Sequence, residues 1–539
     1  MTRLAVLAGS LLVAAGCAAV LGFEDTTLRT DGLIEAGTTD GPDQDGNPPL
    51  DGAASRLTTT PSSVVVRRGA SADITVEVAR GGDVTGTVTA RLTDLPSGVT
   101  ATTATLDPPA TAGKVTLTAT ATAALGPQTI TLHADGTSLP AASLPLLVAD
   151  APGTFDTTFD ADGLVSDLSK GLGATFFALN LQPDGKIVAG GAGGPVGGPL
   201  AGWIVRRYAQ NGVPDTAFNA ATTGLPVDGE LHAMAIDAAG KIVCVGASLS
   251  TLPAAPPALL TIVRLLPTGA VDTTFAGGTI RLPVTEAPMG SIGLGVALEA
   301  NGSVVVVGAR RDAANVEAGV IARFTANGTR DPAFNNGATV VIPTARLVGV
   351  SVEATGPILA AGSTTSGTLP SYLLTKHTSA GAPDTAFASQ GIATFGNTYK
   401  ANGYARLGNG SIVLVGEVQQ GAAAYTAGAT NDKGTALFAR AFAVAPSAGF
   451  FGVAVQDEKR FVAAGHTDVV NGEARVERIF ADGTKDTSFG AAGTSTIEPA
   501  GAANAFSVTL FSAAVQADAR ILVGGNRSNV GAVVYRLWP

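Results

Sequence analysis

Charged residues recur at a fixed spacing through most of this 539-residue chain. A basic residue stands eight positions before the aspartate of a repeated Asp-Thr-x-Phe motif or a close variant of it. Because arginine can bind a carboxylate through two parallel hydrogen bonds, this spacing predicts a repeated ion pair. The alternative is an exposed base and a turn-capping aspartate that never meet. The pairs are Arg207 with Asp215, Arg264 with Asp272, Arg323 with Asp331, Lys376 with Asp384, and Arg478 with Asp486.

One copy of the motif is degenerate, and both charges are missing from it. Thr435 stands where the aspartate is expected, and Ala427 stands where the base is expected. Paired loss is typical of half-buried ion pairs, because one charge left alone is strongly destabilising. Arg536 has no aspartate eight residues after it, and Asp156 has no base eight residues before it. We therefore expect Arg536 and Asp156 to meet across a closed ring of repeats.

Three further carboxylates occupy one equivalent turn position. Asp237, Glu299 and Glu353 each stand three residues before the glycine of a tight turn. If the repeats surround a channel, these carboxylates are expected at one mouth, as a candidate site for a cation or a polyol. A hydrated turn position is the alternative, because other copies have glutamine there. These glutamines are Gln182, Gln456 and Gln516.

No other constellation in the sequence has catalytic or metal-binding spacing. Zinc and copper sites need clustered imidazoles, whereas the four histidines are scattered. They are His133, His232, His377 and His466. A Gly-x-Ser-x-Gly nucleophile elbow is absent, and Cys244 lies in an apolar strand pattern typical of a buried, inert thiol. The sequence gives no evidence of catalysis, and we expect no metal and no cofactor.

The N-terminus has the organisation of an export signal. Arg3 precedes the apolar run 4–13, and small residues follow it. The segment Ala14-Ala15-Gly16-Cys17 resembles the bacterial lipobox, which implies cleavage before Cys17 and diacylglycerol on its sulfur. Because Ala18 rather than aspartate follows the cysteine, the segment resembles that of an outer-membrane lipoprotein. The alternative is a signal peptide with an incidental cysteine.

Composition restricts the class of protein and its partners. Hydrophobic residues make up 45% of the chain and charged residues 14%, which excludes global disorder. The formal charge of −10 argues against nucleic acid as a partner. After a signal peptide of residues 1–16, residues 17–55 have almost no large apolar side chains and are expected to form a disordered tether.

Residues 56–150 alternate between polar and apolar side chains with a period of two. Segments such as 73–78 and 114–119 are expected to be short strands, and turns with proline or glycine separate them. The stretch Leu95-Pro96-Ser97-Gly98-Val99, with the strand 126–132, resembles bacterial immunoglobulin-like domains. The resemblance implies a small immunoglobulin-like β-sandwich, a module that usually acts as a spacer.

Residues 151–539 contain an internal repeat. The Asp-Thr-x-Phe motifs recur every 51 to 59 residues, with short strand patterns between them. From Asp156 to Pro539 this pattern resembles the delta-60 repeat of bacterial secreted proteins. The resemblance implies an all-β fold with a seven-bladed β-propeller of the NHL kind. Radial packing suits such units, because four short strands cannot bury both of their faces alone. An open β-solenoid is the alternative.

The order of strands within a repeat predicts how the ring closes and which face varies. We name the four strands of a repeat A to D, from the inside outward. The last copy ends after its strand C, so the segment 164–168 is expected to supply the missing outer strand. The B–C loops differ most between copies, for example 247–257 and 417–422. The face that they share with the D–A connections is the candidate binding surface.

These patterns lead to one expectation about function and one alternative. We expect a monomeric, lipid-anchored protein of the cell envelope that presents a propeller to a protein or glycan partner. The alternative is a propeller enzyme, a glycan-active hydrolase or lyase, which would need convergent carboxylates or a His/Tyr/Arg cluster.

Overall fold

The computed structural model divides the chain into two compact units. They are Leu21–Ala151 and Pro152–Pro539, the second together with Met1–Val20. The structure describes residues 16–17 (backbone only), 55–80, 84–167, 173–194, 202–218, 225, 227–249, 258–354, 356–366, 369–419, 424–444, 448–466, 473–497 and 507–539. These residues are nearly all β, apart from two short 3-10 helices, η1 (Ala276–Gly278) and η2 (Asn335–Gly337). Among them, no helix has the length and apolar character needed to span a membrane.

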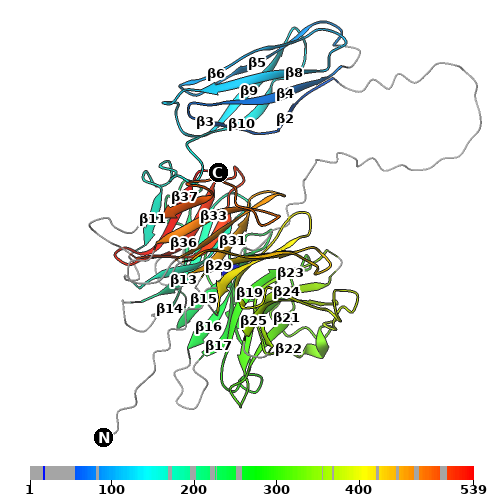
Figure 1. The fold of residues 1–539 in the computed structure, drawn as a ribbon, viewed down its shortest axis with the longest axis vertical. Helices are drawn as coiled ribbons and strands as arrows, with labels where there is room; N and C mark the ends of the chain where they lie inside the picture. Colours follow the sequence, from blue (N-terminus) through cyan, green and yellow to red (C-terminus); the bar gives the residue numbers. More distant parts are fainter. Residues whose placement is uncertain are drawn as a thin grey trace, which may run out of the picture. The chain divides into compact units, whose positions relative to one another are not determined.

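The described part of the first unit consists of two sheets (Figure 1). One sheet is formed, in spatial order, by β2 (Arg56–Thr60), β4 (Ser71–Ala79), β8 (Ala112–Ala119) and β6 (Val99–Ala101). The other is formed by β3 (Val64–Arg67), β10 (Ala142–Ala149), β9 (Gly126–Asp135), β5 (Val88–Thr93) and β7 (Ala104–Leu106). The strands pair antiparallel, except that β10 and β3 run parallel.

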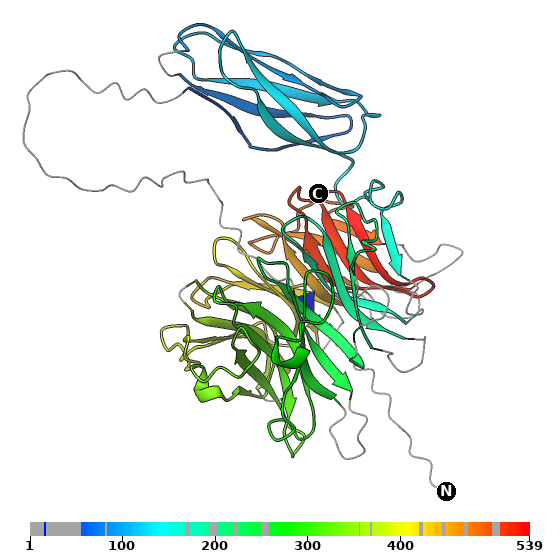
Figure 2. The same cartoon turned by 180° about the vertical axis from the view of Figure 1, so that it is seen from behind.

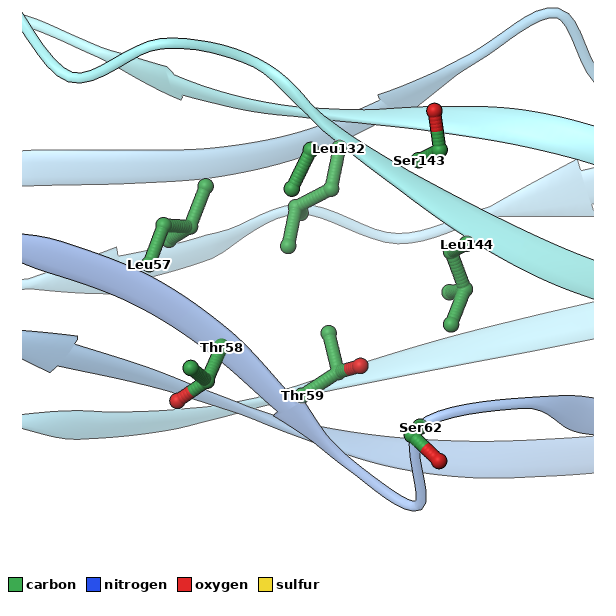
Figure 3. Close-up of a pocket in the computed structure, with 8 residues that line it drawn as sticks. Leu57, Thr58, Thr59, Ser62, Leu132, Ser143 and Leu144 are labelled. Carbon is green, nitrogen blue, oxygen red and sulfur yellow. The ribbon is translucent and has the colours of Figure 1, made fainter. Parts of the chain in front are cut away.

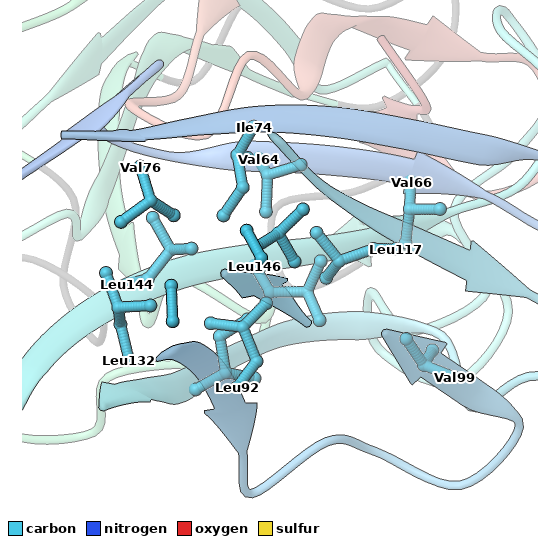
Figure 4. Close-up of a cluster of buried hydrophobic side chains, with 14 of the residues drawn as sticks. Val64, Val66, Ile74, Val76, Leu92, Val99, Leu117, Leu132, Leu144 and Leu146 are labelled. Carbon is cyan, nitrogen blue, oxygen red and sulfur yellow. The ribbon is translucent and has the colours of Figure 1, made fainter. Parts of the chain in front are cut away.

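The apolar residues of these two sheets form one core between them. In β4, Ile74, Val76 and Val78 are buried, whereas the residues between them are exposed. Leu132 and Leu144 of the other sheet belong to the same buried cluster (Figure 4). The period-two alternation therefore corresponds to one buried face and one solvent-exposed face for each sheet.

The described residues of the second unit form seven small sheets, numbered here 1 to 7 in the chain order of their first strands. Strands A to D follow one another in space in each sheet, and sheet 1 has three described strands. In sheet order they are β12 (Thr175–Leu181), β13 (Ile187–Gly193), β14 (Gly202–Tyr208); β15 (Gly229–Ile236), β16 (Ile242–Leu249), β17 (Ala258–Leu265), β18 (Thr279–Arg281); β19 (Ser291–Leu298), β20 (Val304–Arg311), β21 (Glu317–Phe324), β22 (Val340–Pro343); β23 (Ala345–Val352), β24 (Ile358–Ser366), β25 (Leu369–His377), β26 (Ile392–Phe395); β27 (Tyr399–Arg406), β28 (Ile412–Val418), β29 (Ala424–Thr430), β30 (Ala436–Val444); β31 (Gly449–Val455), β32 (Arg460–His466), β33 (Ala474–Phe480), β34 (Thr494–Ile497); and β35 (Val508–Val515), β36 (Ile521–Arg527), β37 (Gly531–Leu537), β11 (Leu164–Asp167).

The inner strands of these sheets lie beside one another in chain order. Figure 2 shows the second unit from behind, with its sheets coloured from teal through green and yellow to red along the chain. Contacts run from β12 through β15, β19, β23, β27 and β31 to β35, and β35 lies beside β12 again. Small residues allow this close approach. A Cβ added to Gly452 of β31, for example, would lie 2.6 Å from the Ser512 backbone of β35. The two-residue strand β1 (Gly16–Cys17) pairs in parallel with β27.

The last sheet joins the two ends of the second unit. Strand β11 pairs antiparallel with β37, with Leu164 opposite Tyr535 and Asp167 opposite Ala532. The outer strand of sheet 7 thus comes from the start of the repeat region, as the truncated last copy predicts. This pairing covers the edge that β37 would otherwise expose.

Candidate functional site

The expected bases and aspartates lie next to each other in every sheet that has both. The shortest nitrogen-to-oxygen distances are 2.9 Å for Arg207–Asp215, 2.9 Å for Arg264–Asp272, 2.8 Å for Arg323–Asp331, 3.9 Å for Lys376–Asp384, 2.8 Å for Arg478–Asp486 and 2.6 Å for Arg536–Asp156. The last pair joins the end of the chain to the first copy of the motif.

Backbone pairing explains the spacing of eight residues. The Asp215 N–H donates to the Arg207 carbonyl at 2.9 Å, and Asp156 donates to Arg536 at the same distance. The chain therefore turns back on strand C, and the two side chains emerge together. One oxygen of each aspartate caps the turn and leaves the other for the base. The Asp272 Oδ1, for example, accepts the Thr274 N–H at 3.1 Å, while Asp272 Oδ2 binds Arg264.

Each of these bases also lies over the phenylalanine that ends the motif. The distance from cation to ring centroid is 4.6 Å for Arg207–Phe218, 4.3 Å for Arg264–Phe275, 5.0 Å for Arg323–Phe334, 5.9 Å for Lys376–Phe387, 4.8 Å for Arg478–Phe489 and 4.6 Å for Arg536–Phe159. The motif therefore supplies both a carboxylate and a ring face to one cation.

Four of the arginines connect their own sheet to the next one. Each donates from Nη1 to a backbone carbonyl in the C–D turn of the following sheet. The acceptors are Pro267 for Arg207, Ala326 for Arg264, Ser379 for Arg323 and Gln210 for Arg536, at 2.6 to 2.7 Å. One side chain thus links a strand, its own turn and the neighbouring sheet. We call this arrangement the clamp.

A second cation reaches the same aspartate in four sheets, and the eight-residue spacing did not predict it. These cations follow the A–B turn directly. They are Lys186, Lys241, Arg460 and Arg520, at 3.9, 3.0, 3.4 and 3.1 Å from their aspartates. The signal in the sequence is a base directly before the first apolar residue of strand B, which only these four copies have.

Burial and charge act against each other in the clamps. Burial alone would raise the pKa of the Asp272 carboxyl, but the Thr274 hydroxyl, Lys241 and Arg264 outweigh it, and the pKa falls well below its usual range. At the ring closure, burial and the nearby Arg520 cation lower the pKa of Arg536 to about 10. Arg536, Arg520 and Asp156 are all almost fully buried.

The degenerate sheet 5 replaces the clamp with a simpler contact. Its strands β29 and β30 form one long hairpin around the turn 431–435. No base stands at Ala427, but Arg440 of β30 donates to the Gly483 carbonyl of sheet 6 at 3.3 Å. Phe438 remains beside Gly483, as Phe159, Phe334 and Phe387 lie beside turn glycines of their next sheets.

The expected cluster of Asp237, Glu299 and Glu353 is not formed. Glu299 binds Arg323 at 3.3 Å, and Glu353 binds both Lys376 and Arg406, at 3.0 and 3.2 Å. The Asp237 Oδ1 accepts the N–H of Lys241 in its own turn. Among the described residues, no three His, Cys, Asp or Glu side chains are grouped as metal ligands. Glu299 and Glu353 therefore extend the clamps of Arg323 and Lys376, whereas Asp237 caps its own turn.

The histidines and cysteines occupy separate structural positions. The His133 Nε2 forms a hydrogen bond with the Thr93 hydroxyl at 2.9 Å. His377 forms hydrogen bonds with the Thr375 hydroxyl and the Gly381 carbonyl. Burial lowers the pKa of His377. Burial raises the pKa of the Cys244 thiol, so it remains protonated and inert. Cys17 is in β1, and only its backbone is described.

Four large exposed apolar side chains belong to sheets 2 and 3, at the end of the strands that forms the expected binding face. Strand B of sheet 2 ends at Leu249, Val284 and Met289 lie in the connection to sheet 3, and Val316 precedes β21. Their exposed fractions are 47%, 43%, 44% and 50%. Met289 donates to the Arg311 carbonyl at 3.3 Å, which joins the connection to the B–C hairpin of sheet 3. We call these four residues the apolar patch.

The opposite face has exposed apolar residues of similar size, but they are dispersed. Phe155, Val213, Ile392 and Leu437 belong to the starts or turns of four different sheets. Isolated exposed apolar residues are ordinary, whereas a group of them marks an interaction surface.

The first unit has a shallow cleft of about 210 Å³ between its two sheets (Figure 3). Leu57 and Thr59 of β2 line one side, and Leu132 and Leu144 line the other. Its lining has no charged side chain, so the cleft offers no group for acid–base or metal chemistry.

Comparison with known proteins identifies the repeat. Residues 182–218 and 299–334 match a family described as "Domain of unknown function (DUF5122) beta-propeller". Each match begins at the first residue of an A–B turn, Gln182 or Glu299. It ends at a clamp phenylalanine, Phe218 or Phe334.

Solved structures and curated proteins add little to this match. Domains 4–9 of the surface layer protein SbsC are 11% identical over 89% of this chain and 81% of that one, with a TM-score of 0.15. Elastase-activated Escherichia coli alpha-2-macroglobulin is 10% identical over 89% of this chain and 34% of that one, with a TM-score of 0.16. Comparison with curated proteins gives no match. The clamps, the small sheets and the family match together show that this chain is a β-propeller repeat protein.

Proposed function

We propose that this protein is a lipid-anchored binding or scaffold protein of the cell envelope. In this proposal the seven sheets are the blades of a closed propeller, and the two-sheet unit is an immunoglobulin-like spacer. Cys17 would carry the lipid, and residues 17–55 would be the tether. The contacts of β35 with β12 and the pairing of β11 with β37 support the closed ring.

The observation that carries the binding role is the apolar patch. Four large apolar side chains, each more than two-fifths exposed, belong to two neighbouring sheets and lie at the same end of their strands, in or beside two B–C loops and one D–A connection. The clamps hold the sheets beneath them, so the patch is presented on a rigid support. A protein partner that buries this patch would gain the free energy of removing apolar surface from water.

The patch is tested by charge insertion with a matched control. Val316→Asp and Met289→Asp place a carboxylate in the patch, whereas Leu437→Asp places one at a residue that is 51% exposed on the opposite face. Each full-length variant is cross-linked in cell envelopes and its adducts are compared with those of the wild type. We expect adducts to be lost in the two patch variants and kept in Leu437→Asp. Identical adducts in all three variants would contradict the proposal.

The anchor is tested separately with Cys17→Ser. If the lipid is on this sulfur, the variant is recovered in the soluble fraction and lacks fatty acid by mass spectrometry, because a peptide without acyl chains has no stable hold on the bilayer. Retention of the variant in the membrane at the wild-type level would reject the anchor and leave the patch proposal standing.

A further inference from the structure

Five aromatic rings from four neighbouring sheets meet near the axis of the ring of inner strands. Phe177 lies 5.4 Å from His232 and 5.0 Å from Phe511, measured between ring centroids. Phe511 lies 5.7 Å from Phe451 and 5.6 Å from His466, and His466 stacks on Phe451 at 4.6 Å with an interplanar angle of 10°. Sheets 6, 7, 1 and 2 thus form one continuous aromatic wall.

A β-bulge in each inner strand explains why these rings meet. Pairing with strand B skips one residue in every inner strand, and that residue leaves the pleat. Four of the five rings stand at this position. The seven bulge residues are Phe177, His232, Leu294, Val348, Asn402, Phe451 and Phe511. The wall opposite the rings therefore has Leu294, Val348 and Asn402, which are smaller.

The aromatic wall contains a polar group without a hydrogen-bond partner. His232 is fully buried, and neither Nδ1 nor Nε2 makes a hydrogen bond. The nearest charge is Glu230, whose Oε2 lies 3.3 Å from Nε2 and is part exposed. A buried imidazole with both nitrogens unsatisfied is costly unless a ligand or water completes it.

An extended segment of this chain lies among the inner strands. Strand β1 lies against β12, β15, β31 and β35, the strands that carry four of the rings. The low exposed fractions of Phe177 and Phe511, 8% and 7%, are those with β1 in place. The proposed cleavage before Cys17 removes residues 1–16, including half of β1.

We infer that this axial site binds a neutral saccharide, from the face that carries the apolar patch. Aromatic faces contact the C–H faces of a sugar ring, and the imidazole and carboxylate of His232 and Glu230 can donate to and accept from its hydroxyls. Glu230 and the chain's net charge of −10 disfavour an acidic sugar. The inference deepens the proposed binding role and rests on the proposed signal cleavage.

The experiment measures binding of neutral oligosaccharides to the processed full-length protein in a detergent without a sugar headgroup. The probes are gluco-, manno-, galacto- and N-acetylglucosamine-based trisaccharides, tested by calorimetry and saturation-transfer NMR. We expect at least one to bind, and Phe511→Ala and His232→Phe each to weaken it about tenfold, since aromatic contacts and single hydrogen bonds have this size.

Two comparisons keep the test decisive. Val348→Ala changes the same bulge position on the opposite wall and should leave affinity within about twofold of wild type. If His232→Phe lowers the melting temperature, Phe177→Leu serves as the second wall variant. Absence of binding by every probe, equal binding by all variants, or binding of an extended peptide in place of sugar would overturn the inference. Binding of a protein partner to the apolar patch is measured separately, by cross-linking. A failed saccharide test therefore leaves the partner proposal intact.

Discussion

Two sheets hold their strands C and D together by different devices. In sheet 7, one carboxylate binds two guanidinium groups between β37 and the turn before β11, and the side chains of Asp156, Arg536 and Arg520 are 0%, 1% and 2% exposed. In sheet 5, Ala427 and Thr435 replace the pair, and one hydrogen bond from Arg440 to sheet 6 remains. The most complete clamp and the missing one thus occur in the same ring.

Covalent continuity accounts for the difference. The chain passes from β29 to β30 through one short turn, so strands C and D of sheet 5 stay together without a clamp. Strands β37 and β11 of sheet 7 come from opposite ends of the repeat region, and only non-covalent contacts hold them together. Opening there would expose strand edges and release the whole ring. The comparison indicates that the clamp matters most where the polypeptide is not continuous.

The largest effect is expected from Asp156→Asn. This change keeps the shape of the turn cap but leaves the buried Arg536 guanidinium without a carboxylate and Arg520 with Asp518 alone. We expect a loss of about 3–5 kcal/mol in the free energy of unfolding. Asp384→Asn is the matched control, because Asp384 is 25% exposed and lies 3.9 Å from Lys376; its loss should stay below about 1 kcal/mol. Denaturant unfolding measures both, and equal losses would show that closure has no special role.

A double-mutant cycle on Arg207 and Asp215 tests whether an ordinary clamp acts as a pair. The side chains are 10% and 16% exposed. Arg207→Met leaves a half-buried carboxylate, so adding Asp215→Asn should restore part of the lost stability. We expect a coupling free energy of about 1–2 kcal/mol. Additive losses, within the error of the unfolding curves, would mean that the two side chains stabilise the fold independently.

A buried carboxyl group in sheet 6, that of Glu477, should make the free energy of unfolding depend on pH. Burial raises the pKa of Glu477, although Lys485 binds its carboxylate at 2.8 Å. The folded state therefore holds this proton more tightly than the unfolded chain, and the stability it provides is lost as pH rises through the folded pKa.

Glu477→Gln removes this pH dependence. Relative to the wild type, the variant should gain about 1 kcal/mol or less between pH 4 and pH 7. The measurement is the free energy of unfolding across that range. Glu458→Gln, at an exposed position of the same sheet, is the control and should follow the wild type. A variant that loses stability relative to the wild type as pH rises would contradict the expected sign.

The smallest effect is expected from Arg440→Ala. The variant loses one part-buried hydrogen bond to the Gly483 carbonyl, for an expected loss of about 0.5–1 kcal/mol in the free energy of unfolding. Lys433→Ala changes an exposed base in the same hairpin and should be neutral. If Arg440→Ala matched Asp156→Asn, the contact between sheets 5 and 6 would be a clamp of full strength, and the argument from chain continuity would fail.

Sequence spacing determined what lies within one repeat. The offset of eight between Arg264 and Asp272 follows from a chain that turns back on one strand, and such local geometry repeats wherever the residues do. The same spacing also predicted that the degenerate copy has no ion pair, because Ala427 and Thr435 stand at the positions of the base and the aspartate. Even the Arg536–Asp156 contact could be predicted, because a truncated last copy and an unpaired first motif leave one arrangement that satisfies both charges.

Only the tertiary structure decided the side-chain contacts that depend on a neighbouring sheet or on the direction in which a side chain points. Glu353 appeared available for a ligand until Arg406 of the next sheet was placed beside it. The second cation was missed because the variable B–C loop lies between it and its aspartate, as for Lys241 and Asp272, so their spacing is not constant. The aromatic wall around His232 was missed because a bulge and neighbouring sheets bring those rings together. Spacing along the chain fixes contacts within a unit, whereas contacts across the ring depend on how many units close it and at what radius.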